Sequence, residues 1–319
     1  MRIHPLIKEI SSNRFLFSLT ILVLFIVFSG IVQPNYFNPS HIFTVVQQAA
    51  PLIIATLGQI FVVLTGAIDL SVGSILIFTD VFAASLMMGS NERTMYAIIL
   101  SVIVGALFGC LNGLGVEFLG LPPLVMTLAS SLGIQGLMYL WCRGFPRGGA
   151  SPILRFVGTA RWGIVPVSIV VWGSAVAIGF LLTRFTRLGW SLKFLGSNRR
   201  AAHVMGINCK IVGTVAYVLS GMFASLAGIL ILGYVGIPSL VLGDDYTMAS
   251  IAAAVLGGVS LSGGTGSVLG AITGGLMMRY ILALLTAFNV SAGIKYIVEG
   301  VVIFTMVAVL AFREKGGNM

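Results

Sequence analysis

Long apolar runs separated by short polar segments dominate the chain. Runs such as Ile21-Leu-Val-Leu-Phe-Ile-Val-Phe28 do not alternate between apolar and polar positions, so they do not match the strands of a β-barrel. A bilayer core about 30 Å thick requires roughly 20 apolar residues per helical span. The pattern predicts about ten transmembrane helices, at residues 15–33, 43–65, 70–89, 95–116, 123–142, 164–183, 210–232, 247–262, 267–286 and 294–311.

These spans predict one membrane domain with short tails. The apolar run that begins at Phe15 is long and lacks a small-residue cleavage site, so we expect it to remain as a span rather than to be removed as a signal peptide. We therefore expect an all-α, polytopic bundle with glycine-interrupted segments over residues 15–312. Residues 1–14 and 313–319 are expected to be cytoplasmic tails.

Composition favours a membrane protein over a soluble one. Of the 319 residues, 58% are hydrophobic and only 8% are charged, whereas about a quarter of the residues in soluble domains are charged. The mean hydropathy of +1.06 is an average over the whole chain. So few charges cannot cover a surface that faces water. Three cysteines lie far apart without a C-x-x-C pair, and we interpret them as packing residues.

The net charge of +9 is interpreted as a signal for orientation, because Lys and Arg accumulate on the cytoplasmic side of membrane proteins. With ten spans and a cytoplasmic N-terminus, eleven of the eighteen basic residues fall on the cytoplasmic side, six of them within residues 184–210. Both termini are then cytoplasmic. The loop at 143–163 opposes this orientation, since it places four arginines outside: Arg143, Arg147, Arg155 and Arg161.

Two glycine-rich stretches of similar sequence interrupt the apolar pattern. The first break is Thr65-Gly-Ala-Ile-Asp-Leu-Ser-Val-Gly-Ser74, and the second break is Gly257-Gly-Val-Ser-Leu-Ser-Gly-Gly-Thr-Gly-Ser267. In the predicted topology both lie on the same side of the membrane. Unwound backbone in hydrocarbon is tolerated only where protein or water satisfies its polar groups. Corresponding breaks in two halves of a transporter point to a substrate pathway.

Asp69 lies inside the first break, just before an apolar helix. Its carboxylate is suited to cap that helix by accepting hydrogen bonds from the N–H groups two and three residues further on. A structural cap between two spans and a fixed element of a pore or gate are both compatible with this position, and the two roles do not exclude each other.

Motifs for covalent chemistry are missing from the sequence. It contains no G-x-x-x-x-G-K-[ST] loop for nucleotide phosphates, no paired Cys and His sets for a metal, and no Ser, His and Asp grouping for hydrolysis. We therefore expect a transporter component rather than an enzyme, with no cofactor or metal of its own. Its energy would come from an ion gradient or from a partner.

The largest polar insertion, at 193–209, is named the coupling segment here. Ser197 or Asn198 is placed to cap a short helix, residues 199–205 favour helix, and Gly206 suits the left-handed position that ends one. The pattern predicts a basic stub of about two turns on the cytoplasmic face. Such a stub is either a linker lying on anionic lipid or a docking helix for a soluble partner that supplies the energy.

Four motifs, in order, resemble the permease subunits of ABC importers for ribose, xylose, arabinose, galactosides and an autoinducer. The first break is similar to T-G-G-I-D-L-S-V-G-S, with Ala67 in place of a glycine. Asn112-Gly113 followed by Leu121-Pro-Pro-Leu-Val-Met-Thr-Leu128 is similar to N-G…P-P-F-I-V-T-L, with Leu124 in place of the common phenylalanine. The spacing of the coupling segment and the second break resemble the other two motifs, and together the four cover roughly residues 40–310.

The resemblance implies a permease of a bacterial inner membrane that imports a monosaccharide by alternating access. It implies four partners: a cytoplasmic ATPase that binds the ATP, a periplasmic sugar-binding protein, a second permease subunit and membrane lipid, without nucleic acid. The residues that match the coupling motif, and that would dock the ATPase, are Gly196, Asn198, Ala201, Ala202, Gly206 and Ile207. The candidate pore or gate residues are Asp69, Ser71, Asn112, Thr127, Ser260 and Ser262.

Three alternatives remain at this stage. A permease for branched-chain amino acids is a related type of importer, but the D-L-S-V-G motif of the first break argues against it. A secondary transporter would work alone on a proton or sodium gradient. A membrane scaffold without transport activity is disfavoured by the two breaks.

Overall fold

The computed structural model of the protein describes residues 14–291, 293–302 and 304–305. Helices dominate it, joined by one 3-10 turn and one two-stranded antiparallel hairpin. In chain order the elements are α2 (Arg14–Val32), η1 (Pro34–Phe37), α3 (Pro39–Val63), α4 (Val72–Met87), α5 (Thr94–Glu117), α6 (Pro123–Cys142), α7 (Pro152–Thr159), β1 (Arg161–Trp162), β2 (Val165–Pro166), α8 (Ser168–Phe185), α9 (Arg187–Ser197), α10 (Arg199–Val204), α11 (Cys209–Val235), α12 (Gly243–Leu256) and α13 (Gly270–Ala287).

A multi-pass helical membrane bundle is confirmed. Seven helices in the described residues are long and apolar enough to cross a membrane, namely α2, α3, α5, α6, α8, α11 and α13. Helices α4 and α12 are apolar but shorter, with 16 and 14 residues. Residues 294–302 and 304–305 of the last predicted span are helical. The rest of that span and the tails predicted at 1–13 and 313–319 lie outside the described residues.

Two segments differ from the sequence-based expectation. The span predicted at 247–262 is wrong in its bounds, because α12 begins at Gly243 and ends at Leu256, where the glycine-rich run starts. Residues 257–269 then follow an irregular path to α13. The loop predicted at 143–163 contains α7 and half of the β1–β2 hairpin. Hydropathy along the sequence predicted neither the end of α12 at Leu256 nor α7 and the hairpin, because hydropathy measures apolar content and not backbone conformation.

Helices α3 and α11 form the interior of the bundle. In the most apolar window of each helix, 89% of α3 and 72% of α11 is buried, against 22% of α2 and of α6. The peripheral helices instead expose large apolar side chains, such as Leu24 at 64% and Leu140 at 76%. An exposed apolar surface of this extent suits lipid, since a soluble monomer rarely leaves one open to water.

Small residues bring α5 and α11 into close contact. A Cβ atom added at Gly221 of α11 would lie less than 3.0 Å from the backbone of Gly105 on α5, and one added at Gly109 would meet the Tyr217 carbonyl group. Helices in membranes associate through such close packing, because hydrocarbon provides little hydrophobic driving force between them. The α5–α11 pair thereby fixes the side of the bundle that carries Asn112.

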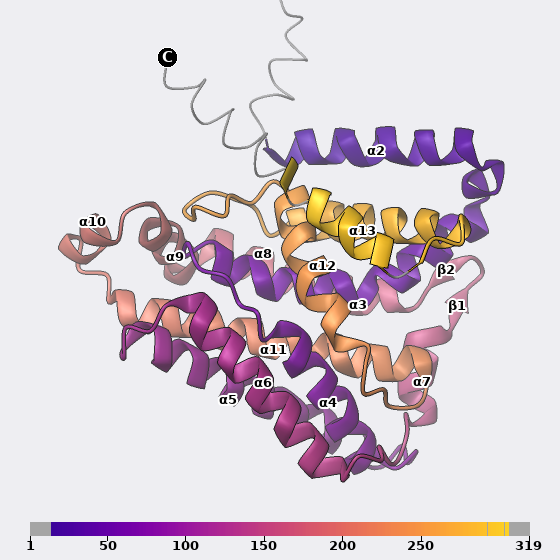
Figure 1. Ribbon diagram of the computed structural model, residues 1–319, viewed down its shortest axis with the longest axis horizontal. Helices are drawn as coiled ribbons and strands as arrows, with labels where there is room; N and C mark the ends of the chain where they lie inside the picture. Colours follow the sequence, from indigo (N-terminus) through magenta and orange to yellow (C-terminus); the bar gives the residue numbers. More distant parts are fainter. Residues whose placement is uncertain (1–13, 292, 303, 306–319) are drawn as a thin grey trace, which may run out of the picture.

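The polar ends of the bundle lie on opposite sides. Helices α9 and α10 project at one end of the molecule, whereas α7 and the β1–β2 hairpin cover the other (Figure 1). The Ala150 N–H donates to the Gly236 carbonyl at 3.0 Å, which ties the end of α11 to the segment before α7. The two glycine-rich breaks lie at the α9–α10 end, so the prediction that they share one side is confirmed.

We predict that Gly221→Val will destabilise the bundle, because its side chain has no space against Gly105. Overpacking of this kind costs about 1–3 kcal/mol. The measurement is thermal unfolding of the purified chain in detergent. Gly136→Val in α6 is the matched control, since nothing lies within 4 Å of a Cβ atom there. Equal melting temperatures for both variants would contradict the assigned α5–α11 packing.

Candidate functional site

Three segments far apart in the sequence meet at one point, named the glycine junction here: residues 64–66 after α3, Gly196 and Ser197 at the end of α9, and Gly263 and Gly264 in the second break. The Gly264 N–H donates to the Leu64 carbonyl at 2.9 Å, which joins the two breaks directly. A Cβ atom on Gly196 would overlap both the Leu64 oxygen and the Gly264 nitrogen. The coupling segment therefore packs against both breaks at once.

Glycine is required at position 264 for two separate reasons. Its φ of +71° is in the left-handed region, which side chains disfavour. An added Cβ atom would also lie 2.9 Å from the backbone of Ser197. The Ser197 hydroxyl also lies against Gly264, whereas at Gly196 the backbones of the three segments meet without a side chain between them. A displacement of one backbone is therefore passed directly to the other two.

Asp69 organises a buried polar cluster next to the junction. Its side chain is 0% exposed. One carboxylate oxygen accepts from the Ser71 N–H at 2.9 Å and from the Ser71 hydroxyl at 2.6 Å, and the other accepts from the Ser220 hydroxyl at 2.8 Å. The Asn112 amide donates to the Ser71 oxygen at 2.8 Å. The Asp69 carboxylate thus joins α11 to the start of α4, and the Ser71 hydroxyl joins α5 to the same point.

Asp69 makes only one of the two N–H hydrogen bonds predicted for it as a helix cap, and the residue at the N-cap position of α4 is Ser71 rather than Asp69. The carboxylate accepts from the N–H two residues further on, as expected, but the Ser71 hydroxyl takes the place of the third N–H. Gln59 of α3 completes the arrangement. With its amide oriented to satisfy both groups, it donates to the Asp69 carbonyl at 3.0 Å and accepts from the Asp69 N–H at 3.2 Å. The unwound backbone is therefore satisfied by protein, as a membrane interior demands.

The six candidate pore residues do not form one site. Asp69, Ser71 and Asn112 belong to the buried cluster. Thr127 is also buried but bonds within its own helix, to the Pro123 carbonyl at 2.8 Å. Ser260 and Ser262 lie in the second break, where the Ser262 carbonyl approaches Gly66. Contact of any of these residues with a solute stays a prediction.

Sequence reasoning missed Gln59 and Ser220, although both contact Asp69. The available signal was a polar residue in the middle of a largely apolar span, and both side chains are 0% exposed. Such residues are costly in hydrocarbon unless they face a partner in the bundle. Their presence in α3 and α11 therefore predicted a buried polar contact but not its identity.

The coupling segment forms the short helix predicted for it. The Asn198 side chain accepts from the Ala201 N–H at 3.0 Å, which confirms it as the cap of α10. Gly206, with a φ of +79°, follows the end of the helix. Ala202 is buried against Leu195, whereas Ala201 is exposed. At the tip, Val204 is 87% exposed.

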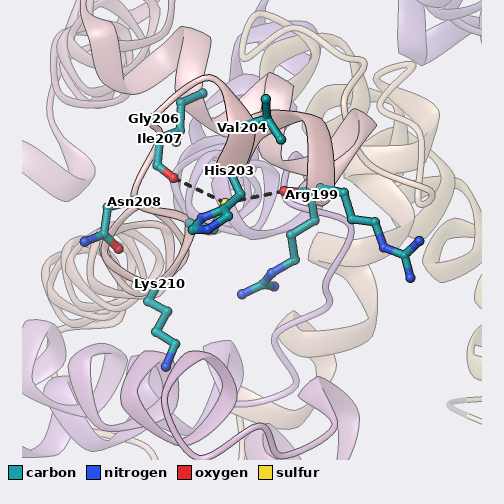
Figure 2. A pocket seen from close by; sticks show the side chains of 9 residues that line it. Arg199, His203, Val204, Gly206, Ile207, Asn208 and Lys210 are labelled. Carbon is teal, nitrogen blue, oxygen red and sulfur yellow. Dashed lines mark hydrogen bonds between the residues drawn. The ribbon is translucent and has the colours of Figure 1, made fainter.

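A basic groove of about 880 Å³ lies along α10 and the start of α11. Figure 2 shows the side chains that surround it, including Arg199, His203 and Lys210. The Cys209 thiol bonds to the carbonyls of Arg199 and Ile207, which closes the turn between the two helices. The groove combines positive charge with the exposed apolar tip of α10, a composition that suits a protein partner.

Arg199 also anchors α10 to the bundle. It forms an ion pair with Glu117 at the end of α5, whose side chain is 4% exposed, while the Arg199 side chain is 55% exposed. Lys210 lies over the Phe118 ring at 5.3 Å from its centroid. A buried carboxylate requires such a partner, so the pair holds α10 at a defined distance from α5.

We predict that Asp69→Ala will lower both the yield of inserted protein and its thermal stability. Each buried donor left without an acceptor costs about 1–3 kcal/mol. Asp69→Asn should be milder, because its amide oxygen still accepts from Ser71. The measurements are membrane yield and unfolding temperature in detergent. Wild-type values for Asp69→Ala would show that the cluster does not support the break.

Comparison with known proteins places these features in a family. The family model described as "Branched-chain amino acid transport system / permease component" matches residues 41–307. The ribose import permease protein RbsC of Escherichia coli K12 is 31% identical over 302 residues, which cover 93% of each chain. The protein of the same name from Bacillus subtilis 168 is 32% identical over 92% of this chain and 91% of its own.

A relative with a different named cargo is equally similar. The autoinducer 2 import system permease protein LsrC of Escherichia coli K12/DH10B is 30% identical over 309 residues, which cover 96% of this chain and 89% of that protein. No solved structure matches the chain.

Proposed function

This chain belongs to the family described as branched-chain amino acid transport system permease components, and we propose from that premise that it is the membrane subunit of an ATP-driven importer for a monosaccharide or a similar small polyhydroxy solute. The observation that carries the proposal is the glycine junction, where the coupling segment packs against both breaks. A transporter that is driven by a partner requires such a connection between its docking surface and its pathway.

Sugar is favoured over amino acid as the cargo. The family description refers to branched-chain amino acids, but the relatives described above are named for ribose and autoinducer 2 and align over nearly the whole chain. Selection among sugars would be left to a separate binding protein, because tight binding in the pathway would trap the solute.

The coupling segment would receive the ATPase on the cytoplasmic side. Its basic groove and the exposed Val204 are arranged to dock a soluble partner. The ATP would be bound by that partner. Closure of the ATPase would displace α10 and α9, and Gly196 would pass the displacement to Leu64 and Gly264. The two breaks would then move together, which is the requirement for alternating access.

The opposite end of the bundle would receive a loaded sugar-binding protein. Helix α7 and the β1–β2 hairpin cover this end and carry Arg155 and Arg161. Arg161 is held in place by hydrogen bonds to Gln47, at 2.8 and 3.1 Å. A second permease subunit, identical or different, would complete the pathway. In this orientation both termini are cytoplasmic and the protein is a component of a bacterial inner membrane.

Reconstitution tests the function directly. We predict that liposomes with the chain alone will not accumulate labelled ribose, xylose or leucine under an imposed proton or sodium gradient. Addition of the ATPase and binding protein that co-purify with the chain should give ATP-dependent uptake of a sugar. Uptake by the chain alone would identify a secondary transporter. ATP-dependent uptake of leucine without sugar uptake would identify an amino acid permease.

Gly206→Val tests the role of the coupling segment. Valine at a positive φ stores strain of about 1–3 kcal/mol, and a coupling energy of that size corresponds to a change of roughly 5- to 150-fold. We expect ATP hydrolysis to continue while sugar uptake falls within this range, with membrane insertion intact. Gly89→Val is the matched control, because Gly89 also has a positive φ and open surroundings but lies at the opposite end. Normal uptake in Gly206→Val would show that residues 193–209 are only a linker.

A further inference from the structure

We propose that a cavity at the end of the bundle opposite the coupling segment is a binding site for a neutral, hydroxyl-rich solute of monosaccharide size. The cavity has a volume of about 220 Å³ and lies between α3, α11, α12 and α13. It is named the distal cavity here. The inference rests on the proposed transport of a small polyhydroxy solute, and it assigns that solute a site within a single subunit.

Polar groups from four helices converge on the distal cavity. Arg279 of α13 donates from Nη2 to the Gln48 oxygen at 2.8 Å, and the Gln48 amide donates to the Tyr234 hydroxyl at 3.3 Å. All three residues line the cavity, together with Tyr246 and Asp245 of α12. The Arg279 Nε is buried and has no hydrogen-bond acceptor among the described residues. A hydroxyl oxygen in the cavity would supply that acceptor.

The charges around the cavity favour a neutral ligand. Arg279 and Asp245 line it with opposite charges, so neither an anion nor a cation gains a net attraction. Donors and acceptors are both present, since amide, guanidinium, carboxylate and phenol groups line one space. A hydroxyl group donates and accepts at once, which matches this mixture.

The rim of the cavity is open and its floor is closed. Tyr234 and Val235, at the end of α11, are 37% and 41% exposed. Ala249 and Leu52, which also line the cavity, are each 3% exposed. At one edge the Tyr296 hydroxyl donates to an Asp245 carboxylate oxygen at 2.6 Å. This shape admits a solute from the end of the bundle but not from the interior.

The same helices connect the cavity to the glycine junction. Helix α3 leads from Gln48 to the first break, and the second break joins α12 to α13. Gln48 lies 15 residues before Val63, which is roughly 22 Å along a helix. Movement of the junction would therefore change the spacing of the helices that hold the polar groups of the cavity. A solute bound there would be released when the breaks move.

Saturation-transfer NMR on the full chain in lipid nanodiscs tests the site. The probes are D-ribose, D-xylose and D-galactose, with ribose 5-phosphate as the charged comparison. We expect signals from at least one neutral sugar and none from the phosphate. Ala249→Phe fills the cavity and Gln48→Leu removes its amide, and each should reduce the signal at least fivefold. Met248→Phe is the matched control, because Met248 is 45% exposed and does not line the cavity.

The outcomes separate this site from the proposed function. Absence of any sugar signal from the wild-type chain, or full signals from both Gln48→Leu and Ala249→Phe, would overturn the site even where ATP-driven uptake is observed. Displacement of a lipid without sugar binding would also overturn it. Sugar binding that is lost in Gln48→Leu, in a chain that shows no ATP-driven uptake with its partners, would retain the site and overturn the importer function. Thermal unfolding shows whether Ala249→Phe still folds. If it does not, the sugar signal of Gln48→Leu alone decides whether the site exists.

Discussion

Unwound backbone within a membrane must find its hydrogen-bond partners inside the protein, and the structure is organised around the two places where this happens. Side chains satisfy the backbone of the first break. The Gln59 amide hydrogen-bonds to the Asp69 backbone, and the Asp69 carboxylate accepts from the Ser71 N–H. The second break is joined to the first by the Gly264–Leu64 hydrogen bond. Each break therefore depends on the other.

This mutual dependence explains how one contact at the α9–α10 end of the bundle can reach both breaks. Gly196 brings the coupling segment into backbone contact with both breaks. Interfaces this tightly packed do not deform gradually, because close-packed interiors have little free volume. The contact is therefore suited to switch between discrete arrangements, which is the behaviour that a driven transporter requires.

The sequence predicted much of this arrangement, and the failures share a physical cause. Apolar run length located the helices, and local rules located the Asn198 cap and the turn at Gly206, because both depend on neighbours within a few residues. The contact of Gly196 with Leu64 and Gly264 joins residues far apart along the chain, and no local pattern encodes it. For the same reason Ser220 was not predicted as a partner of Asp69. The resemblance to a known family supplied the proposed role of the coupling segment, while the residues alone left a lipid-bound linker open as well.

The ion pair between Arg199 and Glu117 has a mechanical consequence. Glu117 lies five residues after Asn112 on α5, about 7.5 Å along the helix axis, and Asn112 reaches the Asp69 cluster through Ser71. The packing of Leu192 in the core and the hydrogen bond from the Cys209 thiol to the Arg199 carbonyl also hold the α9–α10 unit, so Gly196 and Arg199 are two contacts among several. Through these two contacts a displacement of α10 reaches both the glycine junction and α5, so the two helix breaks and the Asp69 cluster respond to the same load.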